Sequence, residues 1–360
     1  MPPSSALQDY YGTNDRIAVL DLLLEMDLDI PFDQAEWDSL HEISVARGNL
    51  ESADLTPYYG RMRGTTYRDL FANLLDIIAD ARNARSVRWV GFHEAWALDA
   101  FPALARSFPD SRFLIMLRDP RAIISSQIGA GERDPSLATH MLSYIRHWRK
   151  YVALAFQYLQ SPLFRGRLHV TAHDLVVSSP RDTLAGICKA FDLDLDDRML
   201  DTNNFIDYTT GQTWKGNSSF EERTVGISAH RATRWRQKLA ESTLNLIEYL
   251  AGPDLQLAGF PVFTRFADPA VKLEPAVISD FLQGLRLPTK WRSDLEDPLA
   301  DLGLETVRRA LLTIASPPED EDLIRRCFLF REVYGALHSG HRPLLQQSIS
   351  SAHKDPVRSM

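Results

Sequence analysis

Residues 108–126 read FPDSRFLIMLRDPRAIISS, and this stretch decides the fold. Phe108-Pro109-Asp110 is a turn, and Arg112–Leu117 is a short, nearly continuous apolar run typical of a central parallel strand covered on both faces. Asp119 and Pro120 follow as an N-cap and a first helical residue, so the spacing predicts a helix from Pro120. The stretch therefore predicts a buried strand that leads directly into a helix.

Strand and helix patterns alternate on both sides of this stretch. Two further strands are predicted at Val87–Phe92 and Leu168–Ala172. Helices are predicted over residues 17–26, 34–45, 65–83, 98–107, 136–160, 180–191 and 231–250, the last closed by Gly252 and Pro253, whereas 201–230 reads as a long loop. This order is typical of α/β proteins with a parallel sheet flanked by helices.

The pattern changes towards the C-terminus, where helices continue without clear strands. We therefore expect an α/β domain over residues 1–262, a helical extension over 263–347 and a flexible tail over 348–360. The extension is expected either to cover a sheet edge or to form the surface of a homodimer.

Composition narrows the class of protein. The chain has 360 residues, 44% hydrophobic and 24% charged, with a net charge of −8, which favours a globular protein and argues against a general nucleic-acid surface. Its 2 cysteines imply no disulfide framework. No apolar run approaches ~18 residues and the start lacks a signal pattern, so we expect no membrane span and a cytoplasmic protein.

The chemistry is concentrated at the end of the central strand. Open α/β sheets bind ligands at the carboxyl ends of their strands, where Arg118 can grip a phosphate and the next helix N-terminus adds partial positive charge. Ser126, about two helical turns further on, can add a hydroxyl donor. The alternative is a structural strand-to-helix turn in which Asp119 is simply a cap.

The same stretch resembles the sulfotransferase segment that binds the 3′-phosphate of 3′-phosphoadenosine 5′-phosphosulfate (PAPS). Four further segments match that family in order: VGFHEAW, HDLVVSSPRDTLAGICKAFDL, WKGNSSF, and RWRQKL with AGPDLQLAGF. The resemblance implies a P-loop NTPase-like parallel sheet, PAPS as co-substrate without a metal, and Arg118 and Ser126 on the 3′-phosphate.

The resemblance also assigns roles to other residues. His93 stands where relatives have lysine and can act as the base for the acceptor, with Glu94 as the other candidate. His173 replaces a tyrosine that packs near the adenine. Lys215, Gly216 and Asn217 match a loop that closes over the nucleotide, although alone they are an ordinary polar turn.

One family feature is missing from its usual place, the 5′-phosphosulfate loop that follows the first strand. Residues 60–66 (GRMRGTT) resemble it superficially, but no apolar strand precedes them and they lie about 27 residues before His93. We interpret them as a helix-entry turn with Thr65 or Thr66 as the N-cap. We expect the first strand to be missing, through a fragment, a misplaced start or a degenerate member.

Three functions compete. The first is sulfuryl transfer from PAPS to a hydroxyl or amine acceptor, which could be a small molecule, a carbohydrate or a lipid. The second is a non-catalytic relative that binds nucleotide or serves as a partner subunit. A nucleotide kinase is disfavoured, because its phosphate loop and its paired magnesium-binding aspartates are also not found.

Overall fold

The computed structural model describes residues 16–51, 53–84, 86–93, 98–133, 141–202, 205–207, 212–213, 226–272 and 298–346. The chain forms two compact units, each described by itself. The sheet unit comprises Met1–Leu20, Arg112–Leu200 and Asn217–Met360, and the helical unit comprises Asp21–Ser111 and Asp201–Gly216. Helix α2 (Arg16–Glu25) crosses the boundary between these ranges.

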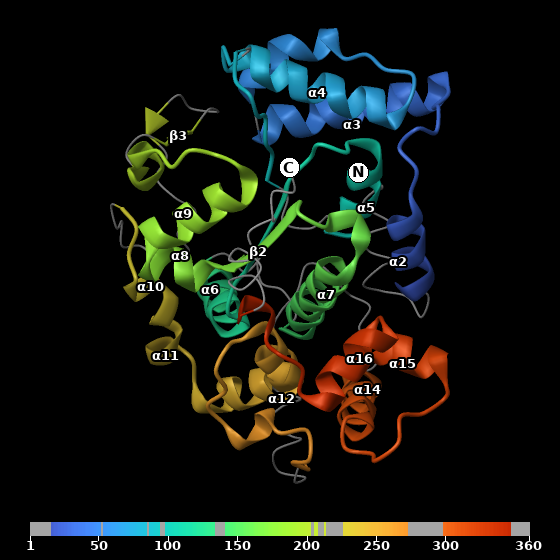
Figure 1. Ribbon diagram of the computed structural model, residues 1–360, viewed down its shortest axis with the longest axis vertical. Coiled ribbons are helices and arrows are strands. Elements are labelled where there is room, and N and C mark those ends of the chain that lie inside the picture. Colours follow the sequence, from blue (N-terminus) through green and yellow to red (C-terminus); the bar gives the residue numbers. More distant parts are fainter. Residues whose placement is uncertain are drawn as a thin grey trace, which may run out of the picture. The chain divides into compact units, whose positions relative to one another are not determined.

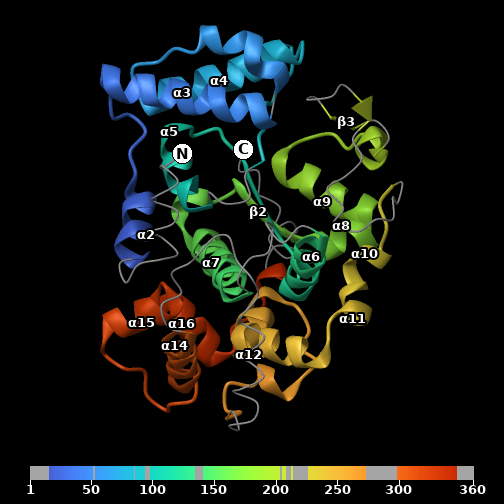
Figure 2. The ribbon, with the colours of Figure 1, turned by 180° about the vertical axis from the view of Figure 1, so that it is seen from behind.

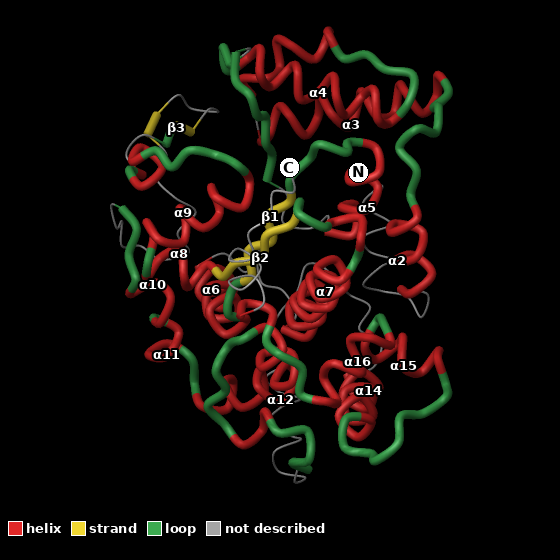
Figure 3. Tube along the Cα trace, viewed as in Figure 1, coloured by secondary structure: helices red, strands yellow, loops and turns green. Residues whose placement is uncertain are grey.

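The sheet unit contains two paired parallel strands (Figure 3). Strand β1 (Phe113–Leu117) pairs with β2 (Leu168–Ala172), in a register that runs from Phe113 opposite Leu168 to Leu117 opposite Ala172. Both strands were expected from the sequence, and they confirm a parallel sheet. The prediction that β1 is covered on both faces was wrong. Phe113, Ile115 and Leu117 on one face are at most 5% exposed, whereas Met116 on the other face is 43% exposed.

Helices pack around this strand pair and supply buried side chains to the hydrophobic core. The long helix α7 (Met141–Gln160) contacts both strands, and its buried stripe includes Ile145, Trp148 and Val152. Helix α6 (Pro120–Arg133) follows β1, while α8 (His173–Ser178) and α9 (Pro180–Phe191) follow β2 (Figure 1). The order strand, helix, strand, helix thus agrees with the α/β expectation.

Helix α12 (Glu241–Ala258) runs through Gly252 and Pro253, so the prediction that these residues close it was wrong. The glycine is required for packing: a Cβ there would lie 2.4 Å from Cα of Ala267, in the turn η7 (Arg265–Ala267). The proline is tolerated because the Tyr249 carbonyl, which residue 253 would otherwise bond, accepts from Arg309. Two short helices, α10 (His230–Thr233) and α11 (Trp235–Lys238), precede α12.

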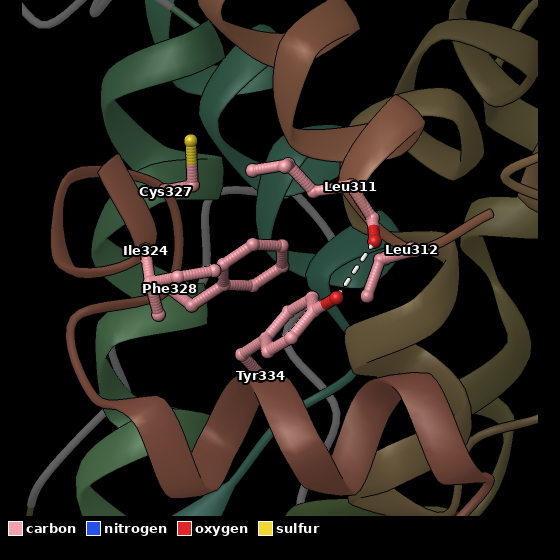
Figure 4. Close-up of a cluster of buried hydrophobic side chains, with 6 residues drawn as sticks. All are labelled: Leu311, Leu312, Ile324, Cys327, Phe328 and Tyr334. Carbon is pink, nitrogen blue, oxygen red and sulfur yellow. Dashed lines mark hydrogen bonds between the residues drawn. The ribbon is translucent and has the colours of Figure 1, made fainter. Parts of the chain in front are cut away.

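Three C-terminal helices, α14 (Pro298–Leu311), α15 (Glu321–Phe328) and α16 (Arg331–Ser339), belong to the same compact unit as the sheet. Figure 2 shows them beside α7 and α12, and α16 contacts both. The C-terminal helices bury a cluster around Phe328 and Tyr334, whose hydroxyl donates to the Leu311 carbonyl at 3.0 Å (Figure 4). The boundaries 1–262, 263–347 and 348–360 stay predictions.

Buried ion pairs join these helices to α7 and α12. Arg308 donates to both carboxylate oxygens of Asp254, at 2.8 and 2.6 Å. Arg149 donates to Glu305 at 2.9 Å, and all four side chains are at most 11% exposed. A helix that places a carboxylate and two arginines in the interior needs these partners, because an uncompensated buried charge is costly.

The helices of the helical unit are α3 (Gln34–Glu51), the 3-10 helix η1 (Ala53–Arg61), α4 (Tyr67–Ala81), η2 (Leu98–Ala100) and α5 (Phe101–Ser107), together with the end of α2. Thr66 is the N-cap of α4 and accepts from the Asp69 amide at 3.1 Å, as expected from the sequence. A 3-10 helix, not a strand, precedes residues 62–66. The interpretation of GRMRGTT as a helix-entry turn is therefore confirmed.

The predicted strand at Val87–Phe92 was wrong. Residues 86–93 form turns and irregular backbone, and Val87, Trp89, Val90 and Phe92 are 36–51% exposed. No described strand supplies a hydrogen-bonded ladder to this segment, so apolar character alone does not make it a strand. In the expected 201–230 loop, two-residue strands β3 (Ile206–Asp207) and β4 (Gln212–Thr213) pair antiparallel.

Candidate functional site

The parallel register sets the geometry of the candidate site. Leu117 of β1 lies opposite Ala172 of β2, so Arg118 and His173 leave the sheet at the same carboxyl edge. Helix α6 begins three positions beyond the end of β1, and α8 begins directly after β2. Strand ends and a helix N-terminus therefore meet where α/β sheets bind anionic ligands.

Arg118 supplies the positive charge at this edge. Its main chain is fixed, because the Trp148 indole donates to the Arg118 carbonyl at 2.8 Å. Its Nε is buried and has no hydrogen-bond partner among the described residues. Burial lowers the pKa of Arg118, and the charges of Asp174 and Asp119 act in the opposite direction. A partly desolvated guanidinium with an unused donor suits an oxyanion.

Asp119 and Arg121, the neighbours in the Arg-Asp-Pro-Arg motif, have a structural role. Asp119 caps α6, accepting from the Arg121 amide at 2.9 Å, as predicted. The Arg121 side chain is 0% exposed and donates to the same carboxylate from Nε at 2.8 Å and from Nη2 at 2.7 Å. Of the two arginines in the motif, Arg121 is thus committed to the fold.

Glu248 of α12 completes this buried group and was missed by the sequence analysis. It accepts from Arg121 Nη1 at 2.6 Å and from the backbone amides of Phe263 at 3.0 Å and Thr264 at 2.6 Å. The guanidinium of Arg121 also lies 4.6 Å from the Trp235 ring centroid and 4.8 Å from that of Phe263. These contacts hold the start of α6, and with it the Arg118 turn, against α11 and α12.

Asp174, directly after His173 in the HDL sequence, is a second residue that the sequence analysis missed. Its Oδ2 is buried without a hydrogen-bond partner among the described residues. Burial and then the charge of Asp119 raise its pKa, whereas the nearby amides of Asp119 and Asp174 and the Arg118 guanidinium favour the carboxylate. The signal in the sequence was its position at the carboxyl end of β2.

The structure places the remaining predicted residues as follows. Ser126 lies in the second turn of α6 and is half-buried, and His173 is the first residue of α8 and is also half-buried. His93 belongs to the helical unit and is exposed. Glu94, Lys215, Gly216 and Asn217 lie outside the described residues. The functional roles of all these residues stay predictions.

The described residues contain neither a metal-ligand cluster nor a membrane-spanning helix. No group of three or more histidine, cysteine, aspartate or glutamate side chains is arranged to hold a metal ion in the part of the chain that the structure describes. Within that part, too, no helix combines the length and apolar character needed to cross a membrane.

Two curated proteins resemble the chain at low identity. Both are described as a putative protein-tyrosine sulfotransferase, one from Caenorhabditis briggsae and one from Caenorhabditis elegans. Each is 24% identical over 178 residues, which cover 46% of this chain. The chain spans 61% of the first relative and 66% of the second. No solved structure matches the chain.

A family model gives the assignment. The model described as "Sulfotransferase family" matches residues 16–197, about half of the chain. The match covers β1, β2, the turn that carries Arg118 and the helix α8 that carries Asp174. Together with the parallel strand pair and the anion-suited edge, this match shows that the chain belongs to the sulfotransferase family.

Proposed function

We propose that the chain is an enzyme that transfers a sulfuryl group from PAPS to a hydroxyl or amine acceptor. The observation that carries the proposal is the Arg118 guanidinium, whose buried Nε has no partner among the described residues and which stands at the carboxyl end of β1. Membership of the sulfotransferase family supplies the reaction class. A P-loop NTPase-like fold is part of this proposal.

In the proposed complex, the 3′-phosphate of the donor lies at Arg118 and at the N-terminus of α6. A bidentate guanidinium and a helix dipole both favour a dianionic phosphate there. Ser126 adds a hydroxyl from the second turn of α6, and His173 packs near the adenine. Lys215, Gly216 and Asn217 close over the nucleotide.

Sulfuryl transfer needs in-line positioning, stabilisation of developing charge and a base for the acceptor, as phosphoryl transfer does. We assign the base to His93 or Glu94. His93 is solvent-exposed in the structure, and a neutral imidazole nitrogen is a proton acceptor, so it can take a proton from an incoming hydroxyl or amine.

The proposed class of acceptors is broader than the acceptor that the relatives' names indicate. Those names point to the phenolic hydroxyl of tyrosine in a protein, which falls within the proposed hydroxyl class. Small molecules, carbohydrates and lipids are the other acceptors in the proposal. We further propose a cytoplasmic protein that forms a homodimer.

A second candidate is a non-catalytic relative that binds the nucleotide or serves as a partner subunit. One observation favours it: in residues 60–66, the segment most similar to a 5′-phosphosulfate loop, the first two residues end a 3-10 helix and the rest lead into α4. The amides of Arg63 and Thr65 donate to Asn73 and Asp69, so these two are not available to a phosphosulfate, which is bound by a cradle of backbone amides.

Binding and transfer assays separate these candidates. Binding of 3′-phosphoadenosine 5′-phosphate (PAP), the donor without its sulfuryl group, is expected to weaken about 10- to 100-fold in Arg118→Ala, since a charge-assisted hydrogen bond contributes roughly 1.5–3 kcal/mol. Arg181→Ala is the matched control, because Arg181 is exposed on α9 and pairs with Asp197. Equal PAP affinity in the two variants contradicts the assigned site.

The transfer assay uses PAPS labelled in the sulfuryl group with a tyrosine-containing peptide, its phenylalanine counterpart and a panel of small hydroxyl compounds and amines. Label transfer that is lost in His93→Ala or in Glu94→Gln supports the enzyme. Wild-type protein that binds PAP but transfers no label to any acceptor supports the non-catalytic relative.

A further inference from the structure

Two buried polar atoms of opposite charge type lie at the same sheet edge without hydrogen-bond partners. They are Nε of Arg118 and Oδ2 of Asp174. The residues leave neighbouring parallel strands, one and two positions beyond the paired Leu117 and Ala172. Buried polar atoms are nearly always hydrogen-bonded, so two such exceptions together indicate a ligand that supplies partners to both.

An oxyanion satisfies Arg118 but not Asp174. A carboxylate oxygen only accepts hydrogen bonds, and so does a fully ionised phosphate. Two anions that share one guanidinium repel each other unless a proton lies between them. A free phosphate monoester has a second pKa of about 6, so protonation of the phosphate near neutral pH costs little free energy.

We infer that Asp174 and the bound 3′-phosphate of the donor share one proton, taken up from solvent when the nucleotide binds. Asp174 is then a specificity residue, selecting a phosphate monoester that can hold a proton over a sulfate ester that cannot. The inference rests on the proposed function, because it assumes that Arg118 holds the 3′-phosphate.

The surroundings of Asp174 favour its protonated form in the complex. Helix α8 packs against β2, α9 and α10. The ionisable residues of these elements are His169 on β2, Arg181, Asp182, Cys188 and Lys189 on α9, His230 and Arg231 on α10, and His173 on α8 itself. Burial raises the pKa of Asp174 even in the absence of a ligand, and Asp119 and Arg118 are the charged groups with the largest effects on this pKa. A bound phosphate adds further negative charge and raises it again.

Linkage gives the expected result. At any pH where the free 3′-phosphate and the free Asp174 are both ionised, uptake of one proton on binding makes the dissociation constant of PAP rise about tenfold per pH unit. Asp174→Asn removes the carboxylate, and its dissociation constant should change less than about twofold between pH 7 and 8.5, because the dianion alone then meets Arg118. Asp174→Asn should also narrow the preference for PAP over its 3′-sulfate analogue.

The test is titration calorimetry of the full chain with PAP, in two buffers of different ionisation enthalpy at each pH. Wild type should take up close to one proton with PAP at pH 7.5 and none with adenosine 5′-monophosphate, which lacks the 3′-phosphate. Asp182→Asn, an exposed carboxylate on α9, is the matched control and should behave as wild type. Thermal unfolding of Asp174→Asn verifies that the variant is folded, and the wild-type proton count does not depend on it.

The outcomes are distinguishable. Parallel pH curves for wild type and Asp174→Asn, with no proton uptake on PAP binding, overturn the inference while the PAP site at Arg118 stands. Wild-type protein that binds no PAP at any pH overturns both this inference and the proposed function.

Discussion

Arg309 and Tyr249 contact each other twice. Nη1 of Arg309 donates to the Tyr249 carbonyl at 2.7 Å, and the guanidinium carbon lies 4.1 Å from the Tyr249 ring centroid. That carbonyl is the one for which Pro253 supplies no helical N–H. An arginine from α14 thus completes the hydrogen bonding of α12, which explains how the helix continues through a proline.

Arg309→Met should destabilise the protein by about 2–4 kcal/mol, because the buried Tyr249 carbonyl loses the donor that replaces the missing N–H of Pro253. The carbonyls of Tyr249 and Asp268 both accept from this side chain. Pro253→Ala restores an N–H in α12, so Arg309→Met should cost about 1 kcal/mol less in that background. Urea unfolding of the four proteins of this double-mutant cycle measures the difference, and strict additivity would contradict the role of the proline.

Gly252 is expected to tolerate no side chain. A Cβ at this position would lie 2.4 Å from Cα and 2.5 Å from O of Ala267, both backbone atoms that cannot rotate away. Gly252→Ala should therefore cost about 1–3 kcal/mol despite the higher helix propensity of alanine. Gly335 in α16 has nothing within 4 Å of the equivalent position, so Gly335→Ala should instead stabilise by about 0.5–1 kcal/mol. Thermal unfolding compares the pair, and a shift in the same direction for both would refute the packing argument.

The two arginines of the Arg-Asp-Pro-Arg motif should respond in opposite ways. Arg121→Met breaks a buried pair with Asp119 and Glu248 and should cost about 3–5 kcal/mol of stability. Arg118→Met removes a partly desolvated charge with an unused Nε, so stability should change by less than about 1 kcal/mol while PAP binding weakens about 10- to 100-fold. Urea unfolding and calorimetry on both variants check this, and a large stability loss in Arg118→Met would show that its role is structural.

Local signals predicted the part of the site that depends on neighbours in sequence. The apolar run before Arg118, the Asp119 cap with Pro120, and the Thr66 cap all involve residues within a few positions of one another, and the structure contains them. The match at Leu168–Ala172 is of the same kind, because a short apolar run bounded by turns indicates a buried strand.

Such local signals could not identify partners that lie far apart in the sequence. Glu248 lies 127 positions from Arg121, and nothing in its own helix pattern indicates that it meets this arginine. The continuation of α12 depends on Arg309, 60 positions from Tyr249. The local rule that a proline ends a helix therefore failed here, because it takes no account of a donor that is distant in sequence. The failed strand at Val87–Phe92 shows the converse, since a favourable apolar run still needs a neighbouring ladder.

Acid should weaken the attachment of the C-terminal helices through Glu305. Burial alone raises the pKa of this carboxyl, but the charge and hydrogen bonds of Arg149 and the charges of Arg146 and Arg308 outweigh burial and hold it far below its ordinary 4.5. A depressed folded-state pKa stabilises the protein above the unfolded value, and this contribution is lost as pH falls below about 4.5 towards the folded pKa.

One such carboxyl contributes a slope of up to about 1.4 kcal/mol per pH unit in that window. Glu305→Gln should lower stability at pH 7, because Arg149 and Arg146 lose their anion, yet it should flatten the acid limb between pH 4.5 and 3. Glu319→Gln, at an exposed position before α15, should keep the wild-type slope. Urea unfolding at each pH gives the slopes, and equal slopes in wild type and Glu305→Gln would assign the acid sensitivity to other carboxyls, since a glutamine cannot take up the proton that the argument requires.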